Sequence, residues 1–150
     1  MCAFLMTSAT PFEFALLNGA VVTVLDLHQR RRLMCMWREK FASSVMRQTG
    51  RSVHLGFDWH AFSYGFTRSK HGLRGLELYL AEAAPEVYVV PEDEDNPAFA
   101  CRASALLDFS SCHTDVLVFP VALSWTMAFT HEQPELGPYF SRAEWCELDP

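Results

Sequence analysis

One pair of neighbouring residues carries the side chains needed for acid–base chemistry. His131 and Glu132 stand where a predicted strand leaves the sheet, and an imidazole beside a carboxylate is typical of a general base or of metal ligands. Adjacent residues of a strand point to opposite faces, so these two side chains are not expected to converge. The sequence therefore favours a structural role, with His131 fixing the turn before Gly137-Pro138.

An enzymatic site is the alternative hypothesis. It would use a pocket near His131, Glu132, His60 and Asp58, and it requires these side chains to lie within hydrogen-bonding reach in a cleft. Cys112 and His113 pair a thiol with an imidazole, but adjacency in sequence does not supply the geometry of a dyad.

Motifs that would identify a known chemistry are missing from the sequence. It contains no Gly-x-Ser-x-Gly, P-loop, His-Glu-x-x-His or dinucleotide fingerprint. The six histidines show no metal-ligand spacing, and none of the cysteines forms a Cys-x-x-Cys pair. We therefore expect no catalytic residues, no metal and no cofactor.

A run of four acidic residues is the candidate binding site. Glu92, Asp93, Glu94 and Asp95 precede Asn96, without the glycine and distal glutamate of an EF-hand loop. A plain solvated loop is the favoured interpretation. The functional alternative is that these carboxylates present negative charge to a basic protein partner.

Charge is distributed unevenly along the 150 residues, whose net charge is -6. Residues 27–74 hold ten Lys and Arg against two acidic residues, whereas residues 75–150 hold two Arg against fourteen. Such asymmetry marks an interaction surface or is neutralised inside the fold, and both interpretations stay open. The basic run 30–32 favours a solvated helix face, and the aromatic stretch 52–66 favours sheet strands over a nucleic-acid platform. No nucleic-acid partner is expected.

Composition indicates a soluble, cytoplasmic protein. Half of the residues are apolar, yet no stretch approaches the roughly 20 apolar residues that span a bilayer. The first 25 residues lack the positive region of a signal peptide. Five scattered cysteines are poor material for a disulfide framework and fit a reducing compartment. No membrane partner is expected, and the oligomeric state is left open.

Two helices are predicted from the spacing of apolar residues. The first begins at the N-cap Asp26 and ends at Gly50, with Met34, Trp37, Phe41 and Val45 on one face. The second covers residues 73–83, and its apolar stripe consists of Leu73, Leu76, Leu80 and Ala83.

Strands are predicted at 20–25, 86–90, 116–119 and 125–129, with one or two more within 52–66. The continuous apolar run 116–119 is typical of an interior strand covered on both faces, and Pro120 belongs at its end. Trp125, Met127 and Phe129 alternate with small residues, which places the large side chains on one face. These two strands form a predicted hairpin. Residues 97–112 suit either a short helix or extended chain.

These elements predict one α+β domain over residues 1–150. It has a mixed or antiparallel sheet of four to six strands, with two main helices packed on one face. Residues 1–10 are expected to be frayed, and residues 141–150 are expected to form a loose tail.

The stretch Trp125-Thr126 to Thr130-His131-Glu132, followed by Gly137-Pro138-Tyr139-Phe140, resembles the C-terminal pattern of a group of small uncharacterised bacterial proteins. Trp59-His60-x-Phe62-Ser63 is similar to their central motif. In size and acidity this group resembles the immunity proteins of polymorphic toxin systems. The resemblance implies a non-catalytic protein-binding module, and its partner would be a basic protein such as a cognate toxin.

Overall fold

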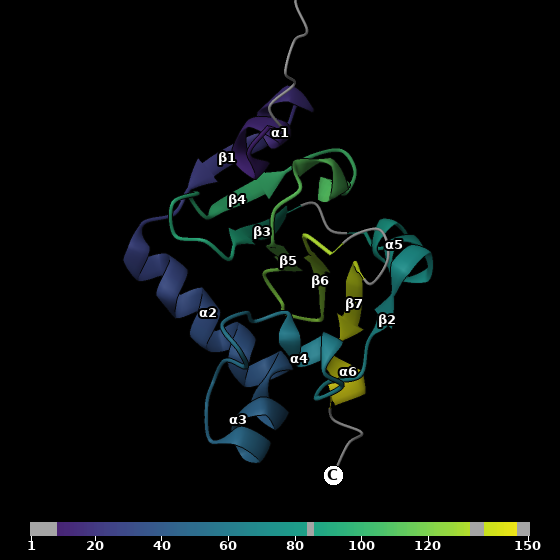
Figure 1. The fold of residues 1–150 in the computed structure, drawn as a ribbon. Coiled ribbons are helices and arrows are strands. Elements are labelled where there is room, and N and C mark those ends of the chain that lie inside the picture. Colours follow the sequence, from purple (N-terminus) through teal and green to yellow (C-terminus); the bar gives the residue numbers. More distant parts are fainter. Residues whose placement is uncertain (1–8, 84–85, 133–136, 147–150) are drawn as a thin grey trace, which may run out of the picture.

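The computed structural model describes residues 9–83, 86–132 and 137–146, which form an α+β fold around one antiparallel sheet (Figure 1). The seven strands lie in the order β1-β4-β3-β5-β6-β7-β2. Their bounds are β1 (Val21–Val24), β2 (Lys70–His71), β3 (Glu86–Pro91), β4 (Phe99–Arg102), β5 (Val116–Pro120), β6 (Trp125–Phe129) and β7 (Tyr139–Arg142). The helices of the described residues are α1 (Pro11–Leu17), α2 (Leu27–Phe41), α3 (Ser43–Thr49), α4 (His60–Ser63), α5 (Gly72–Leu80), α6 (Ala143–Cys146) and a short 3-10 helix, η1 (Phe109–Cys112).

The sheet has more strands than the four to six predicted. The unpredicted strands β2, β4 and β7 are only two to four residues long, and they are recognised by their pairing with β7, β3 and β6 respectively. Such short segments carry too few residues to show a period of two, so pairing defines them rather than local pattern.

The predicted hairpin is confirmed. β5 and β6 are antiparallel neighbours, with Val116 opposite Phe129 and Val118 opposite Met127. Every residue of both strands is buried. Val118 and Met127 belong to the core on one face of the sheet, whereas Leu117 and Ala128 belong to the core on the other.

Helices cover both faces of the sheet, so the prediction that the two main helices share one face is wrong. Trp37 and Phe41 of α2 pack in the core that contains Leu117, whereas Tyr79 of α5 packs in the core that contains Val118. A strand that is apolar on both sides requires cover on both sides, which explains the second helical layer.

The first predicted helix is confirmed at both ends but is broken in the middle. Asp26 and Gln29 form a reciprocal capping box, and Gly50 ends α3 in the left-handed conformation. The Thr67 hydroxyl donates to the Phe41 carbonyl at 2.5 Å, and Val45 N–H bonds to Ala42 instead. A distant hydroxyl thus replaces one helical hydrogen bond at the break.

The second predicted helix forms as α5, but of its predicted apolar stripe only Leu76 packs against the core. Leu73 is 72% exposed and Leu80 is 48% exposed, whereas Gly75 and Tyr79 are buried. A Cβ on Gly75 would lie 2.6 Å from the Lys70 carbonyl oxygen. The helix therefore packs Gly75 against the Lys70 backbone and leaves Leu73 and Leu80 largely exposed to solvent.

Two further expectations are corrected. The stretch 52–66 forms turns and α4 rather than sheet strands, since Gly56 and Gly65 have positive φ and reverse the chain. Residues 141–146 are not a loose tail, because β7 extends to Arg142 and α6 follows it. Residues 1–8 and 147–150 lie outside the described residues. Residues 97–112, left open by the sequence, contain both β4 and η1.

Candidate functional site

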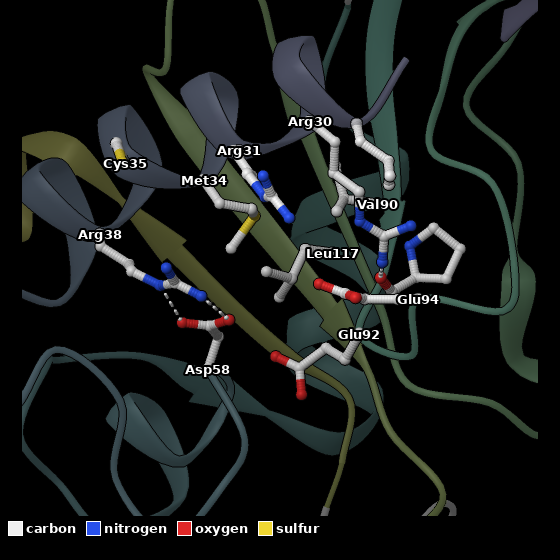
Figure 2. A pocket seen from close by; sticks show the side chains of 12 residues that line it. Arg30, Arg31, Met34, Cys35, Arg38, Asp58, Val90, Glu92, Glu94 and Leu117 are labelled. Atoms are coloured by element: carbon white, nitrogen blue, oxygen red, sulfur yellow. Dashed lines mark hydrogen bonds and ion pairs between the residues drawn. The ribbon is translucent and has the colours of Figure 1, made fainter. Parts of the chain in front are cut away.

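A cleft of about 370 Å³ lies between α2 and the segment that follows β3 (Figure 2). Arg31 and Arg38 project into it from α2, and Glu92 and Glu94 project from the opposite side. The other wall residues are Leu27, Arg30, Met34, Cys35, Asp58, Val90, Pro91 and Leu117. The cleft therefore has a basic wall, an acidic wall and several apolar lining residues.

Arg30 fixes the acidic loop to α2. Its side chain is only 7% exposed, and the guanidinium donates to the backbone carbonyls of Asn96 at 2.7 Å, Asp93 at 2.8 Å and Pro91. Burial lowers the pKa of Arg30, and the charges of Glu94 and Asp93 act in the opposite direction. One cation thus holds three carbonyls of a loop more than sixty residues away in sequence.

The four acidic residues of this loop, grouped in sequence as one candidate surface, have different environments. Asp93 accepts hydrogen bonds from the backbone and side-chain amides of Asn96 at 2.9 and 3.0 Å. Glu94 and Asp95 are exposed, and Glu94 points into the cleft (Figure 2). Glu92 lines the cleft but is partly buried. The loop is therefore a fixed turn, not a uniformly solvated run of charge.

Glu92 is the most perturbed carboxyl group of the site. Its Oε1 accepts the Trp59 backbone N–H at 3.1 Å, whereas Oε2 is buried and has no hydrogen-bond partner within the described ranges. Burial raises the pKa of Glu92 to about 9, with the charges of Asp58 and Asp115 adding to the effect. Glu92 is therefore protonated at neutral pH.

Asp58 also lines the cleft, and its carboxylate forms a bidentate ion pair with Arg38. Arg38 Nε and Nη2 donate to the two Asp58 oxygens at 2.8 and 3.1 Å, as the dashed lines of Figure 2 show. This hydrogen-bonded partner raises the pKa of Arg38 against the effect of burial. The pair links α2 to the chain just before α4.

The four residues of the enzymatic alternative, His131, Glu132, His60 and Asp58, lie in one region of the fold but do not form one hydrogen-bonded site. Asp58 pairs with Arg38, while the His60 Nδ1 lies 2.8 Å from the His54 carbonyl oxygen. Burial raises the pKa of Tyr139, and the negative charge of Glu132 adds to this effect. No hydrogen bond joins any two of the four candidates in the described part of the chain, and Asp58 alone lines the cleft.

His131 instead connects the ends of two neighbouring strands. Its Nδ1 lies 2.9 and 3.0 Å from the Asp115 oxygens, and its backbone N–H donates to Asp115 at 2.8 Å. The rings of Phe57 and Trp59 lie 5.8 and 5.7 Å from the imidazole. His131 thus joins the exit of β6 to the entry of β5. The contact predicted with the turn before Gly137 involves residues 133–136, which lie outside the described residues.

The environment of Cys112 disfavours a thiol nucleophile beside His113. Cys112 is buried, and burial together with the charge of Asp108 raises its pKa to about 11. A thiol with a raised pKa carries little thiolate at neutral pH. Cys35 and Cys101 are likewise free thiols.

Two features are absent from residues 9–83, 86–132 and 137–146, which the structure describes. No group of three or more His, Cys, Asp or Glu side chains there is arranged to hold a metal ion. None of the helices in these ranges is both long enough and apolar enough to cross a membrane.

The sequence places Glu92 in a loop that does line the cleft, but it does not show the contacts of this carboxyl group or of its loop. It predicted an exposed carboxylate beside three others, and it did not identify Arg30 or Arg38 as partners of this segment. A local signal for burial is the apolar run Val87–Pro91 that leads directly into Glu92. The contacts to Trp59 and Asp115 arise only from the fold.

The chain belongs to the DUF4275 family, a domain of unknown function whose family model matches residues 21–140. The matched range runs from β1 into β7 and includes every residue that lines the cleft. Neither a curated protein nor a solved structure matches the chain.

Proposed function

We propose that this member of the DUF4275 family is a non-catalytic protein-binding module, of the kind represented by immunity proteins that neutralise bacterial toxins. Its partner is a basic protein, which docks on the acidic wall of the cleft. The observation that carries this proposal is the attachment of the acidic loop to Arg30, because it holds the backbone that bears Glu94 and Asp95 in one conformation before any partner arrives.

Preorganisation is what distinguishes this loop from an ordinary acidic surface segment. Fixing the backbone of a flexible loop upon binding costs about 1–2 kcal/mol for each residue ordered, and this cost reduces affinity. Here the loop backbone is held by Arg30 and by the Asp93–Asn96 hydrogen bonds in the free protein. A partner therefore meets Glu94 and Asp95 on a fixed backbone.

Electrostatics supports a basic partner with a defined orientation. Glu94 and Asp95 are exposed, and complementary charge accelerates association and selects the partner. The opposite wall carries Arg31, which is also exposed. A basic surface placed across both walls would be repelled by Arg31, so the two walls together determine how the partner sits.

The test is co-expression with the toxin encoded by an adjacent gene, followed by co-purification and a growth-protection assay. Glu94→Lys combined with Asp95→Lys should slow association at least tenfold, because it reverses the charge of the docking wall. The matched control, Glu77→Lys combined with Glu144→Lys, makes the same change in net charge at exposed positions away from the cleft. It should change association less than twofold.

High salt should weaken binding of the wild type more than binding of the loop variant, since exposed charges are screened within about 8–10 Å at physiological ionic strength. The proposal is overturned if no neighbouring toxin co-purifies and the gene protects against none. If the wild type and the Glu94→Lys, Asp95→Lys variant bind the partner equally well, the acidic wall is not the docking surface.

A further inference from the structure

One edge of the sheet is a strand with a single neighbour. β1 ends the strand order and pairs only with β4, so no strand of the described residues lies beyond it (Figure 1). The opposite edge, β2, is two residues long and carries Lys70, and both short length and lysine keep an edge from pairing further. The four residues of β1 (Val21–Val24) include neither a charge nor a proline. The β1 edge is therefore unprotected.

The backbone groups that face away from β4 belong to Val22 and Val24. Leu25, which follows β1, donates its N–H to the Ala98 carbonyl oxygen at 2.9 Å. In an antiparallel pair, residues bonded to the neighbouring strand alternate with residues whose N–H and C=O point the other way. Thr23 therefore bonds to β4 as Leu25 does, whereas the N–H and C=O of Val22 and Val24 point outward from the sheet.

Exposed apolar side chains concentrate around this edge. Of the twelve large hydrophobic residues that are exposed in the described part of the chain, five lie within residues 16–27. The segment 14–25 also contains no charged residue, although the whole chain carries a net charge of -6. Open backbone groups beside apolar surface are typical of an edge that another strand covers. The five exposed residues are Leu16, Leu17, Val21, Val24 and Leu27.

Helix α1, which precedes β1 in the chain, packs on a face of the sheet and not over this edge. The Phe12 ring lies 5.6 Å from that of Phe99 in β4, and the Phe14 ring lies 5.4 Å from that of Phe109 in η1. These contacts belong to the core that contains Val118. Helix α1 therefore leaves the β1 edge open.

We propose that β1 pairs with β1 of a second copy of the chain, antiparallel and about a twofold axis at Thr23, so that the two sheets join into one. A symmetric dimer uses the same surface on both copies, and that surface must therefore complement itself. The proposal does not depend on the function proposed above, because it uses the edge of the sheet and not the acidic loop.

The β1 edge complements itself in this register. Val22 lies opposite Val24 of the second copy, and since both have outward N–H and C=O groups, each such pair exchanges both N–H···O bonds. Thr23 lies opposite Thr23 of the second copy. Asp26, the first charged residue after β1, lies opposite Ala20, so like charges do not meet across the interface.

An axis at Val22 would lack free donors. It would place Val24 opposite Ala20, whose N–H already donates to the Ala15 carbonyl oxygen at 3.1 Å. An axis between two residues also fails, because it would set the outward groups of Val22 or Val24 against Thr23, whose own groups face β4.

An axis at Val24 meets the same obstacle from the other end of the strand. It would place Val22 opposite Asp26, whose N–H already donates to the Gln29 side chain at 2.9 Å. It would also bring a carboxylate next to the apolar edge. Among these registers, the axis at Thr23 alone uses backbone groups that are unoccupied in the single chain.

The first experiment is sedimentation equilibrium of the whole protein over a dilution series. We expect a dimer with twice the 17.1 kDa mass of one chain. Since the interface consists of backbone groups and uncharged side chains, added salt should change its dissociation constant by less than about twofold. Salt thus separates this contact from partner binding at the acidic wall, which salt should weaken.

Charge at Thr23 tests the position of the axis. Thr23→Lys and Thr23→Glu each place two like charges opposite each other, and each should raise the dimer dissociation constant by about tenfold or more. An equal mixture of the two variants should return to within about twofold of the wild-type value, because unlike charges then face each other. Leu73→Lys, at an exposed residue of α5, is the matched control and should dimerise as the wild type does.

Amide hydrogen exchange identifies the backbone groups involved and checks the fold of each variant. The Val22 and Val24 amides should be protected in the wild-type dimer and lose that protection in Thr23→Lys. The amide of residue 23, which bonds to β4, should stay protected in both proteins. Loss of its protection would report an unfolded variant, and the mixture of oppositely charged variants would then fail to form a dimer.

Four outcomes decide the proposal. A mass of 17.1 kDa at every concentration would overturn the dimer, and protected Val22 and Val24 amides in that monomer would show that a segment of the same chain covers the edge. A dimer that Thr23→Lys leaves intact would exclude β1 as the interface. A mixture without recovery would exclude the axis at Thr23.

The two proposals of this article can fail separately. The Glu94→Lys, Asp95→Lys variant should dimerise as the wild type does, because neither residue lies near β1 in the strand pairing. Thr23→Lys should in turn bind the basic partner as tightly as the wild type, to within about twofold. Loss of dimerisation with intact partner binding, or the reverse, therefore identifies which surface was assigned wrongly.

Discussion

Replacing Glu92 with Gln should make the protein more stable at neutral pH and remove part of its sensitivity to alkali. Gln has nearly the same shape as protonated Glu, and its side-chain oxygen can still accept the Trp59 N–H. The variant differs from the wild type mainly in that it has no proton to lose. Its effect should therefore depend on pH in a way that packing changes do not.

The size of the effect follows from the raised pKa. In the folded protein the pKa of Glu92 is about 9, whereas its ordinary value is 4.5. Between these values the folded state keeps a proton that the unfolded state has lost, so stability falls as pH rises, by about 1.4 kcal/mol per pH unit. The contribution of Glu92 is fully present below pH 4.5 and is lost as pH rises toward 9.

Urea unfolding of wild type and Glu92→Gln between pH 5.5 and 8.5 measures this slope. The stability of the variant relative to the wild type should increase steadily with pH, by up to about 4 kcal/mol over the range. Taking the difference between the two proteins removes the titration of all groups that they share.

Glu94→Gln removes an exposed carboxyl group from the same loop, and its difference curve should stay within about 0.5 kcal/mol. A flat difference curve for Glu92→Gln would show that Glu92 is ionised in the folded protein. That result would refute the reasoning about its environment.

Three substitutions test other contacts, each by urea unfolding. Arg30→Met should cost about 3 kcal/mol, because three backbone carbonyls of the acidic loop lose a charged donor. Thr126→Val should cost about 1–3 kcal/mol, because the buried indole N–H of Trp37, now 2.9 Å from the hydroxyl, would lose its acceptor. Gly75→Ala should cost about 1–3 kcal/mol, since the new methyl group would lie 2.6 Å from the Lys70 carbonyl oxygen.

Matched substitutions show whether these effects come from the stated contacts. Arg32→Met, Thr23→Val and Leu73→Ala change exposed residues of α2, β1 and α5, and each should stay within about 0.5 kcal/mol. Ala has a helix propensity about 1 kcal/mol better than Gly. A stabilised Gly75→Ala protein would therefore contradict the close approach of α5 to the Lys70 backbone.

The elements that the sequence predicts well are those whose pattern lies within a short stretch of neighbouring residues. Asp26 caps α2 through a hydrogen bond to a residue three positions away. The alternation of Trp125, Met127 and Phe129 is visible within a single strand and correctly placed them in one core. Such signals need no knowledge of the rest of the chain.

The failures have a common origin in long-range contacts. Leu73 and Leu80 fit a helical stripe, but it is Gly75 that faces the rest of the fold, where a Cβ would lie 3.3 Å from the Pro138 carbonyl oxygen. Glu92 reads as one of four solvated acids, yet its environment comes from Trp59. Hydrophobic period and charge runs cannot report a contact between segments separated by thirty or more residues.

The order of the strands also has a consequence for how the chain folds during synthesis. Residues 9–83 supply only β1 and β2, which lie at opposite edges of the sheet, whereas residues 86–142 supply the five strands between them. The first half of the chain therefore leaves the ribosome without a strand partner for either segment.

Helix α2 also lacks its packing partners at this stage, because Trp37 and Phe41 belong to the same core as Leu117 and Phe119, which are synthesised much later. Contacts of such long sequence separation slow folding and leave apolar surface exposed in the meantime. A ribosome stalled before β5 should consequently hold an N-terminal half that is sensitive to protease, and sensitivity should fall sharply once β7 has emerged.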